Sequence, residues 1–156
     1  MCWQCDHPGA TQADYLRVLR KTITKSRWAV QYVEDERRPF GYTIGLHKRG
    51  FAEYLVTGVS PDRAMQLLNS VADYTIREVQ PKAGDTMTIG GEVHLEFVEV
   101  AQPDAHLVFA VGLYGPSVRA LQLVWRDERG HSPWCPDFDD GRGSQPVLGK
   151  RGPQNA

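Results

Sequence analysis

The chain has 156 residues, 41% hydrophobic and 24% charged, and its 18 basic and 19 acidic side chains give a formal net charge of −1. This balance lacks the basic surplus that binds nucleic acid or an anionic membrane, so we expect neither as a partner. No stretch of the sequence approaches the roughly 20 apolar residues of a membrane span, and the first residues lack the apolar core of a secretion signal. We therefore predict a cytoplasmic protein whose partner is an unidentified protein or small molecule.

The chain is predicted to begin with a loop over residues 1–10 and to continue as a helix. Thr11 is a suitable N-cap, and Asp14 holds the capping-box position three residues later. Apolar side chains then recur at helical spacing, which predicts a helix over 11–26. Three segments with strand-like alternation or apolar runs follow, the first two as a hairpin. These strands are predicted over 28–35, 40–46 and 53–59.

A second helix is predicted from Ser60, where an N-cap serine, a proline and an acidic residue follow one another, to residue 78. A third is predicted over 104–114, although its Val and Phe residues also suit a strand. From Gly130 onward Pro, Gly and Asp are frequent, which predicts irregular structure and a disordered tail over 151–156. Further strands are predicted over 86–89, 93–100 and 119–125.

Most successive strands in this order are joined by links of hairpin length. Such links predict a mainly antiparallel sheet. The fold class is therefore predicted to be α+β, with a single domain over 11–150 in which two or three helices pack against the sheet.

Several strings within these elements are similar to one known family. They are F-G-Y-T-I-G-L, E-Y-L-V-T-G-V-S-P-D-R-A-M-Q-L-L-N, V-R-A-L-Q-L-V-W and the closing Q-P-V-L-G. Over about residues 26–150 the chain resembles the bacterial family known as domain of unknown function 4262. The resemblance supports the single-domain prediction and implies no particular activity. Members of that family commonly carry an acidic residue near the position of Cys135.

Cysteines and histidines at the two ends of the chain indicate a metal site. Cys2 and Cys5 have the C-x-x-C spacing with which two thiolates bind one ion, and His7 follows two residues later. In a reducing cytoplasm, this pattern favours metal binding or catalysis over a disulfide. Cys135 would complete the shell, with His131 competing for the fourth position. The predicted ion is zinc, although iron and copper accept the same ligands.

The metal hypothesis has two functional forms, and other chemistries stay open. With four protein ligands the zinc would be structural in a small binding or regulatory module, whereas three ligands and a water would suit a metal-dependent hydrolase. C-W-Q-C also has the spacing of a redox pair, but no strand precedes it. Loss of Met1 would make Cys2 an N-terminal nucleophile. An acidic run is expected to be a solvated loop, with a hard cation as the alternative. It comprises Asp137, Asp139 and Asp140.

Polar side chains inside apolar strands are candidates for a pocket. Gln122 points to the side of small and apolar residues, so it is either a hydrogen-bond node of the core or a ligand contact. His47 and Glu53 flank a turn, and if their side chains met they would form either an acid–base pair or, more commonly, a surface ion pair of little value. A metal-free interaction module is the remaining hypothesis. It would act through a sheet face that carries Tyr42 and Trp125.

Overall fold

The computed structural model describes residues 6–153, and its centre is a six-stranded sheet of order β1-β2-β3-β6-β5-β4 within that range. The strands are β1 (Ala29–Val33), β2 (Phe40–Ile44), β3 (Glu53–Thr57), β4 (Thr86–Ile89), β5 (Val93–Glu99) and β6 (Ala120–Trp125). The helices are α2 (Gln12–Ser26), α3 (Pro61–Arg77), α4 (Pro103–His106) and α5 (Val108–Tyr114), with the short 3₁₀ turns η1 (His47–Arg49) and η2 (Phe138–Gly141).

The sheet consists of two antiparallel halves joined by one parallel pair. β1, β2 and β3 form one half, β4, β5 and β6 form the other, and β3 runs parallel to β6 between them. The prediction of a single α+β domain with a mainly antiparallel sheet is confirmed. The parallel pairing of β3 with β6 could not be predicted from hairpin-length links, because α3, β4, β5, α4 and α5 lie between the two strands in the sequence.

The first two helices begin at the residues that the sequence indicates. Thr11 and Asp14 form a complete capping box, in which the Thr11 hydroxyl accepts from the N–H of Asp14 and the Asp14 carboxylate accepts from the N–H of Thr11. The hydroxyl of Ser60 caps α3 by accepting from the N–H of Arg63 at 3.2 Å. Among the described residues, no helix has both the length and the hydrophobicity that crossing a membrane requires.

The third predicted helix is two helices, because Leu107 leaves the helical conformation. Its φ of −91° and ψ of 59° separate α4 from α5. The Leu107 side chain is fully buried. The single helix predicted over 104–114 is therefore wrong in one respect: the backbone turns at the residue that anchors this segment in the core.

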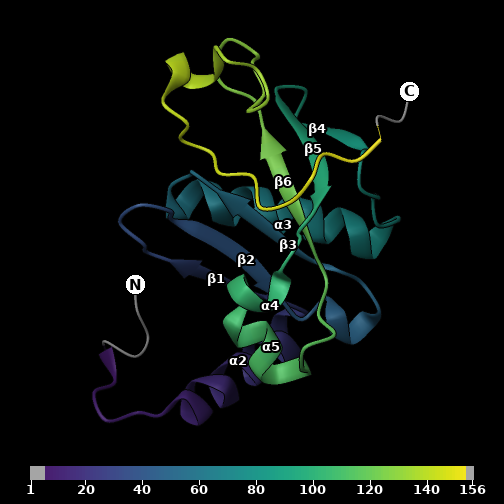
Figure 1. Ribbon diagram of the computed structural model, residues 1–156. Coiled ribbons are helices and arrows are strands. Elements are labelled where there is room, and N and C mark those ends of the chain that lie inside the picture. Colours follow the sequence, from purple (N-terminus) through teal and green to yellow (C-terminus); the bar gives the residue numbers. More distant parts are fainter. Residues whose placement is uncertain (1–5, 154–156) are drawn as a thin grey trace.

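The two faces of the sheet are covered by different parts of the chain (Figure 1). α3 covers one face, where it contacts β1, β2 and β3, and its apolar side belongs to a core around Tyr54 and Phe97. On the opposite face, α2 and α5 pack around Tyr42 and Leu55. An extended segment near the C-terminus crosses the rest of that face, as the yellow chain in Figure 1 shows.

This segment, residues 145–151, is called the C-terminal strap below. Gln122 holds its middle, since the side-chain amide donates to the carbonyl oxygen of Pro146 (2.8 Å) and accepts from the N–H of Leu148 (2.8 Å). A Cβ atom on Gly149 would collide with the carbonyl oxygen of Glu99, so only glycine permits this close approach to β5.

The end of the strap is tied to β5 by an ion pair. Arg151, the first residue of the predicted tail, donates two hydrogen bonds of 3.0 Å to the carboxylate of Glu96. The ordered chain therefore reaches at least this residue.

Substitution of Gln122 by Leu should destabilise the protein by about 2–4 kcal/mol, because it leaves buried polar groups of the strap without partners. Urea unfolding measures this loss, and faster hydrogen exchange of the Leu148 amide would locate it in the strap. The control is Gln66→Leu on the exposed side of α3, which should change stability by less than about 0.5 kcal/mol. Equal stability of Gln122→Leu and wild type would contradict the assignment.

Candidate metal centre

After β6 the chain forms an irregular loop, residues 126–142, that is organised by Asp127. The Asp127 carboxylate accepts hydrogen bonds from the main-chain N–H groups of Arg129 (3.0 Å), His131 (2.8 Å) and Asp139 (2.8 Å). One side chain thus joins the first and last parts of the loop. This fixes the position of His131 relative to η2.

Asp127 also places a fixed negative charge inside the loop. Its side chain is only 11% exposed, and burial by itself opposes ionisation. The three N–H donors and the neighbouring His131 imidazole outweigh the effect of burial and hold the pKa of Asp127 below its usual value. The carboxylate is therefore ionised at neutral pH.

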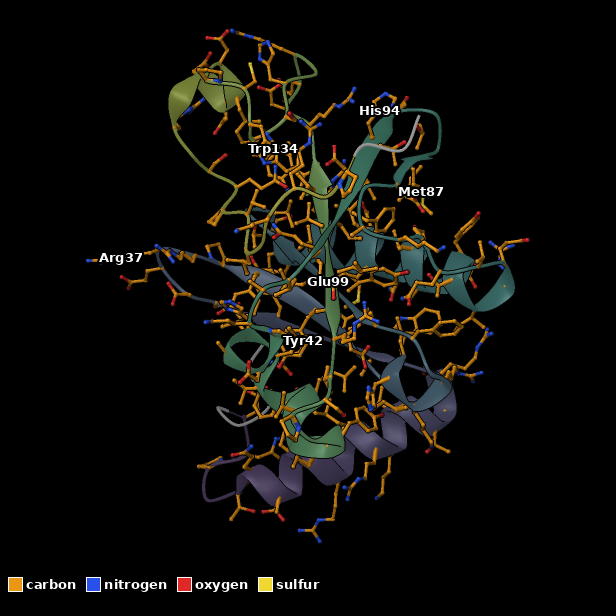
Figure 2. All side chains as sticks on the ribbon, turned by 45° about the vertical axis from the view of Figure 1, so that its right-hand side comes forward. Arg37, Tyr42, Met87, His94, Glu99 and Trp134 are labelled. Atoms are coloured by element: carbon orange, nitrogen blue, oxygen red, sulfur yellow. The ribbon has the colours of Figure 1, made fainter. Side chains whose placement is uncertain are left out.

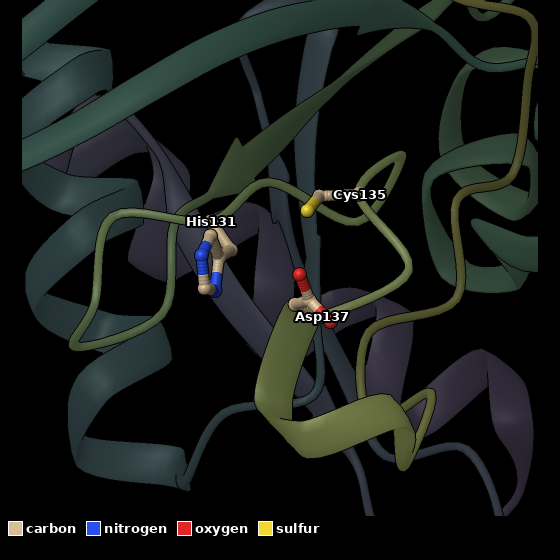
Figure 3. Close-up of side chains that lie close together, drawn as sticks. All are labelled: His131, Cys135 and Asp137. Carbon is tan, nitrogen blue, oxygen red and sulfur yellow. The ribbon is translucent and has the colours of Figure 1, made fainter.

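Three side chains of different chemistry meet within this loop. His131, Cys135 and Asp137 each offer one ligand atom, and the three atoms lie within 4.8 Å of one another. Figure 3 shows the imidazole, the thiol and the carboxylate around a common space. His131 and Cys135 are half-buried, whereas Asp137 is exposed. The cluster is therefore open to solvent on one side.

Consecutive turns bring these residues together. The N–H of Cys135 bonds to the carbonyl oxygen of Ser132 at 2.9 Å, and the N–H of Phe138 bonds to that of Cys135 at 3.0 Å. Phe138 is buried, and its ring centroid lies 5.4 Å from that of Trp125. This aromatic contact anchors the second turn on the end of β6.

His131 is oriented by the same carboxylate that organises the loop. Its Nδ1 is buried, makes no hydrogen bond with any residue in the range 6–153, and lies 3.4 Å from Oδ2 of Asp127. Histidines that bind metals usually turn their other nitrogen toward a carboxylate or carbonyl in this way. With Nδ1 facing Asp127, Nε2 would be the nitrogen left to bind an ion.

The donor set fits a borderline-soft divalent ion such as zinc. Thiolate, imidazole and carboxylate are its usual protein ligands, and bond lengths of about 2.0–2.3 Å in a tetrahedron separate ligand atoms by roughly 3.3–3.8 Å. The three atoms of the cluster, within 4.8 Å of one another, would thus need to approach by at most about 1.5 Å on binding. Side-chain rotation is sufficient for a movement of this size.

The structure brings together two of the five residues predicted to bind the metal. His131 and Cys135 meet, while His7 is exposed and lies just before α2. The beginning of the described chain and the loop lie at opposite ends of the molecule (Figure 1). Cys2 and Cys5 lie outside the described residues.

Asp137 is the residue of the cluster that is not among the predicted zinc ligands. It was expected to belong to a solvated acidic run with Asp139 and Asp140. Those two carboxylates do pair with arginines at the surface, Asp139 with Arg142 (3.2 Å) and Asp140 with Arg129 (3.1 Å). The spacing H-x-x-x-C-x-D was the available signal, because it places three ligand types within one short loop.

The predicted pocket residues Gln122 and Tyr42 are buried in the core. Gln122 is a hydrogen-bond node, one of the two interpretations that the sequence left open. The Tyr42 hydroxyl accepts from the N–H of Phe109 at 3.1 Å, and burial raises its pKa. The expected interaction face is wrong, because Tyr42 is fully buried and Trp125 packs on the opposite side of the sheet.

Glu53 is a buried carboxylate surrounded by donors. It accepts hydrogen bonds from the Thr43 hydroxyl (2.9 Å) and from three consecutive backbone N–H groups over 45–47 (2.9–3.1 Å). Its contact with His47 is thus to the main chain, and the His47 ring packs 5.3 Å from the ring of Tyr114. This arrangement fixes the turn that links β2 to η1.

Replacing Glu53 by Gln should destabilise the fold by about 2–4 kcal/mol, because the new NH₂ group would face the N–H groups of Gly45 and His47. Burial raises the pKa of Glu53, and the N–H and hydroxyl donors only partly oppose it. Proton uptake by Glu53 therefore stabilises the folded state. This gain in the free energy of unfolding is complete below the ordinary pKa of 4.5 and is lost as pH rises through the raised pKa. The advantage of wild type over Glu53→Gln should be largest near about pH 4 and narrow toward neutrality in urea unfolding.

The matched control for this substitution is Glu92→Gln, since Glu92 is exposed. It should leave stability and its pH dependence nearly unchanged. A Glu53→Gln protein as stable as wild type at every pH would show that the four donors do not depend on the carboxylate.

Comparison with known proteins places the chain in a family. The model of the family described as Domain of unknown function (DUF4262) matches residues 22–139, which include all six strands and the His131–Cys135–Asp137 cluster, while the C-terminal strap lies beyond the match. No curated protein and no solved structure matches the chain. Because the match covers well over half of the sequence, the chain belongs to the DUF4262 family.

Proposed function

We propose that the protein binds one zinc ion through His131, Cys135 and Asp137. The observation that carries this proposal is the meeting of an imidazole, a thiol and a carboxylate within 4.8 Å in a single short loop. Nitrogen, sulfur and oxygen donors together select a transition metal over calcium or magnesium, which prefer oxygen alone.

The surroundings of the cluster support the proposal. Asp127 faces His131 as an outer-shell carboxylate would. The loop has little regular structure of its own, so an ion held by three of its side chains would add stability where apolar packing is sparse. Because Cys135 must lose its proton to bind, affinity should rise with pH. A reducing cytoplasm, the predicted location, would keep this thiol free.

The ion would have a structural role and would hold the loop 126–142 in one conformation beside β6. A second candidate function is metal-dependent hydrolysis. It is favoured by the three-ligand cluster with the exposed Asp137, which leaves a fourth position for water within the described part of the chain. Zinc lowers the pKa of bound water to about 7 and so supplies hydroxide at neutral pH. Hydrolysis of an activated ester by the zinc-loaded protein, absent in Cys135→Ser, would favour this second candidate.

Elemental analysis with native mass spectrometry of the untagged protein should find one zinc per chain. Cys135→Ser and His131→Ala should lose it, because each removes a ligand. Asp127→Asn should weaken binding by about 10–100-fold, the usual effect of removing an outer-shell partner. The control is the double variant Cys2→Ser/Cys5→Ser, which should retain the ion.

The opposite pattern would contradict the proposal. Zinc retained by Cys135→Ser and lost from the Cys2→Ser/Cys5→Ser variant would assign the ion to the N-terminal cysteines. Absence of metal from protein kept reduced and supplied with zinc would exclude both arrangements.

Zinc should also stabilise the folded protein. At a free concentration 100 times the Kd, binding adds about 2.7 kcal/mol to the free energy of unfolding. For a chain of this length the melting temperature should rise by roughly 5–10 °C. Calorimetry with and without a chelator measures the shift in melting temperature. The control is Cys135→Ser, which lacks a zinc ligand and should show no shift. An equal shift in both proteins would indicate binding elsewhere.

A further inference from the structure

A polar patch lies on the sheet face that α3 does not cover. In β4 and β5, Thr86 is paired with Glu96 and Thr88 with His94, and in β6 Val124 is paired with Glu96. Their sequence neighbours Met87, Leu95 and Trp125 pack in the core on the α3 side. Because side chains alternate along a strand, the paired residues of the patch point to the opposite face. Arg126, directly after the end of β6, continues the patch.

The loop and the strap border this patch and leave a partly open cavity of about 110 Å³. Ser132 and Trp134 from the loop and Arg151 from the strap form the side opposite the sheet. Figure 2 shows Trp134 and His94 at the same end of the sheet. At about 30 Å³ per water, the space holds three or four waters or a polyatomic ion of similar size.

The charges around the cavity leave a positive surplus. Glu96 and Arg151 neutralise each other through two hydrogen bonds of 3.0 Å, and the Arg151 guanidinium lies 4.3 Å from the centre of the Trp134 ring. Arg126 forms no ion pair within the described chain. Among the residues that line the cavity, Arg126 therefore carries the charge that no lining carboxylate balances.

The neutral groups of the lining favour an oxyanion. Thr86, Thr88 and Ser132 add hydroxyl donors on both sides of the space. Thr88 also lies 3.0 Å from Nδ1 of His94 and so positions that ring. Hydroxyls and a guanidinium arranged around a compact space suit a tetrahedral oxyanion, since each of its oxygens accepts from a different direction.

We propose that this cavity is a binding site for a phosphate group, with Arg126 supplying the unbalanced charge. The group is either free inorganic phosphate or the end of a small phosphate monoester whose remainder extends past the exposed Arg126. The site is separate from the metal ligands, although both use the loop 126–142. It therefore does not depend on the zinc proposal.

The test is an NMR titration of the full chain with inorganic phosphate, in the presence of a chelator and at constant ionic strength. The indole N–H of Trp134 and the amide of Ser132 should shift with a saturable dependence on phosphate. Arg126→Gln should weaken binding at least about tenfold, because it removes a charge-assisted donor. The melting temperature of this variant should be unchanged, since Arg126 is exposed.

The matched control is Arg129→Gln, whose arginine pairs with Asp140 on the outside of the loop and should not affect binding. Titration with phenyl phosphate separates the two sources: tighter binding than phosphate indicates a monoester, and weaker binding indicates the free ion. No saturable shift with either, or equal affinity in Arg126→Gln and wild type, overturns the proposal. Running the titration both with the chelator and with one equivalent of zinc keeps this outcome independent of the effect of the ion on the loop 126–142.

Discussion

The hydrogen bonds between Gln145 and the main chain of Trp125 are the contact on which both candidate sites depend. The Gln145 side chain accepts from the N–H of Trp125 and donates to its carbonyl oxygen, each at 2.9 Å. The chain leaves the sheet at Trp125 and returns to the same residue, so the intervening loop is closed at its base. Without this closure, neither the ligand cluster nor the roof of the cavity would have a fixed position over the sheet.

The closed loop presents different residues to two environments. His131, Cys135 and Asp137 gather on one side, while Ser132 and Trp134, which lie between them in sequence, line the cavity above β4, β5 and β6. Asp127 and Phe138 hold the first group in place, and the Arg151–Glu96 pair holds the second. A short irregular segment can serve two sites because Phe138 and Gln145, whose side chains belong to neither site, hold it against the end of β6.

The sequence allowed prediction of the features that depend on near neighbours. The Thr11–Asp14 box and the Ser60 cap require partners three residues away, and the strands were visible from their alternation. The break at Leu107, the parallel β3–β6 pair and the role of Gln145 depend on residues distant in the chain. Asp137 was missed for the same reason: an acidic residue in a polar loop becomes a candidate ligand only when folding brings it to an imidazole and a thiol.

The parallel pairing of β3 with β6 also determines the order in which the protein can fold. Every residue of β3 is buried, yet the strand that covers its second edge begins 63 residues later, at Ala120. During synthesis β1, β2, β3 and α3 can assemble first and leave that edge with unpaired N–H and C=O groups, which favour association between chains. The interval before β6 emerges from the ribosome is thus the period in which the nascent chain is most exposed to misassembly.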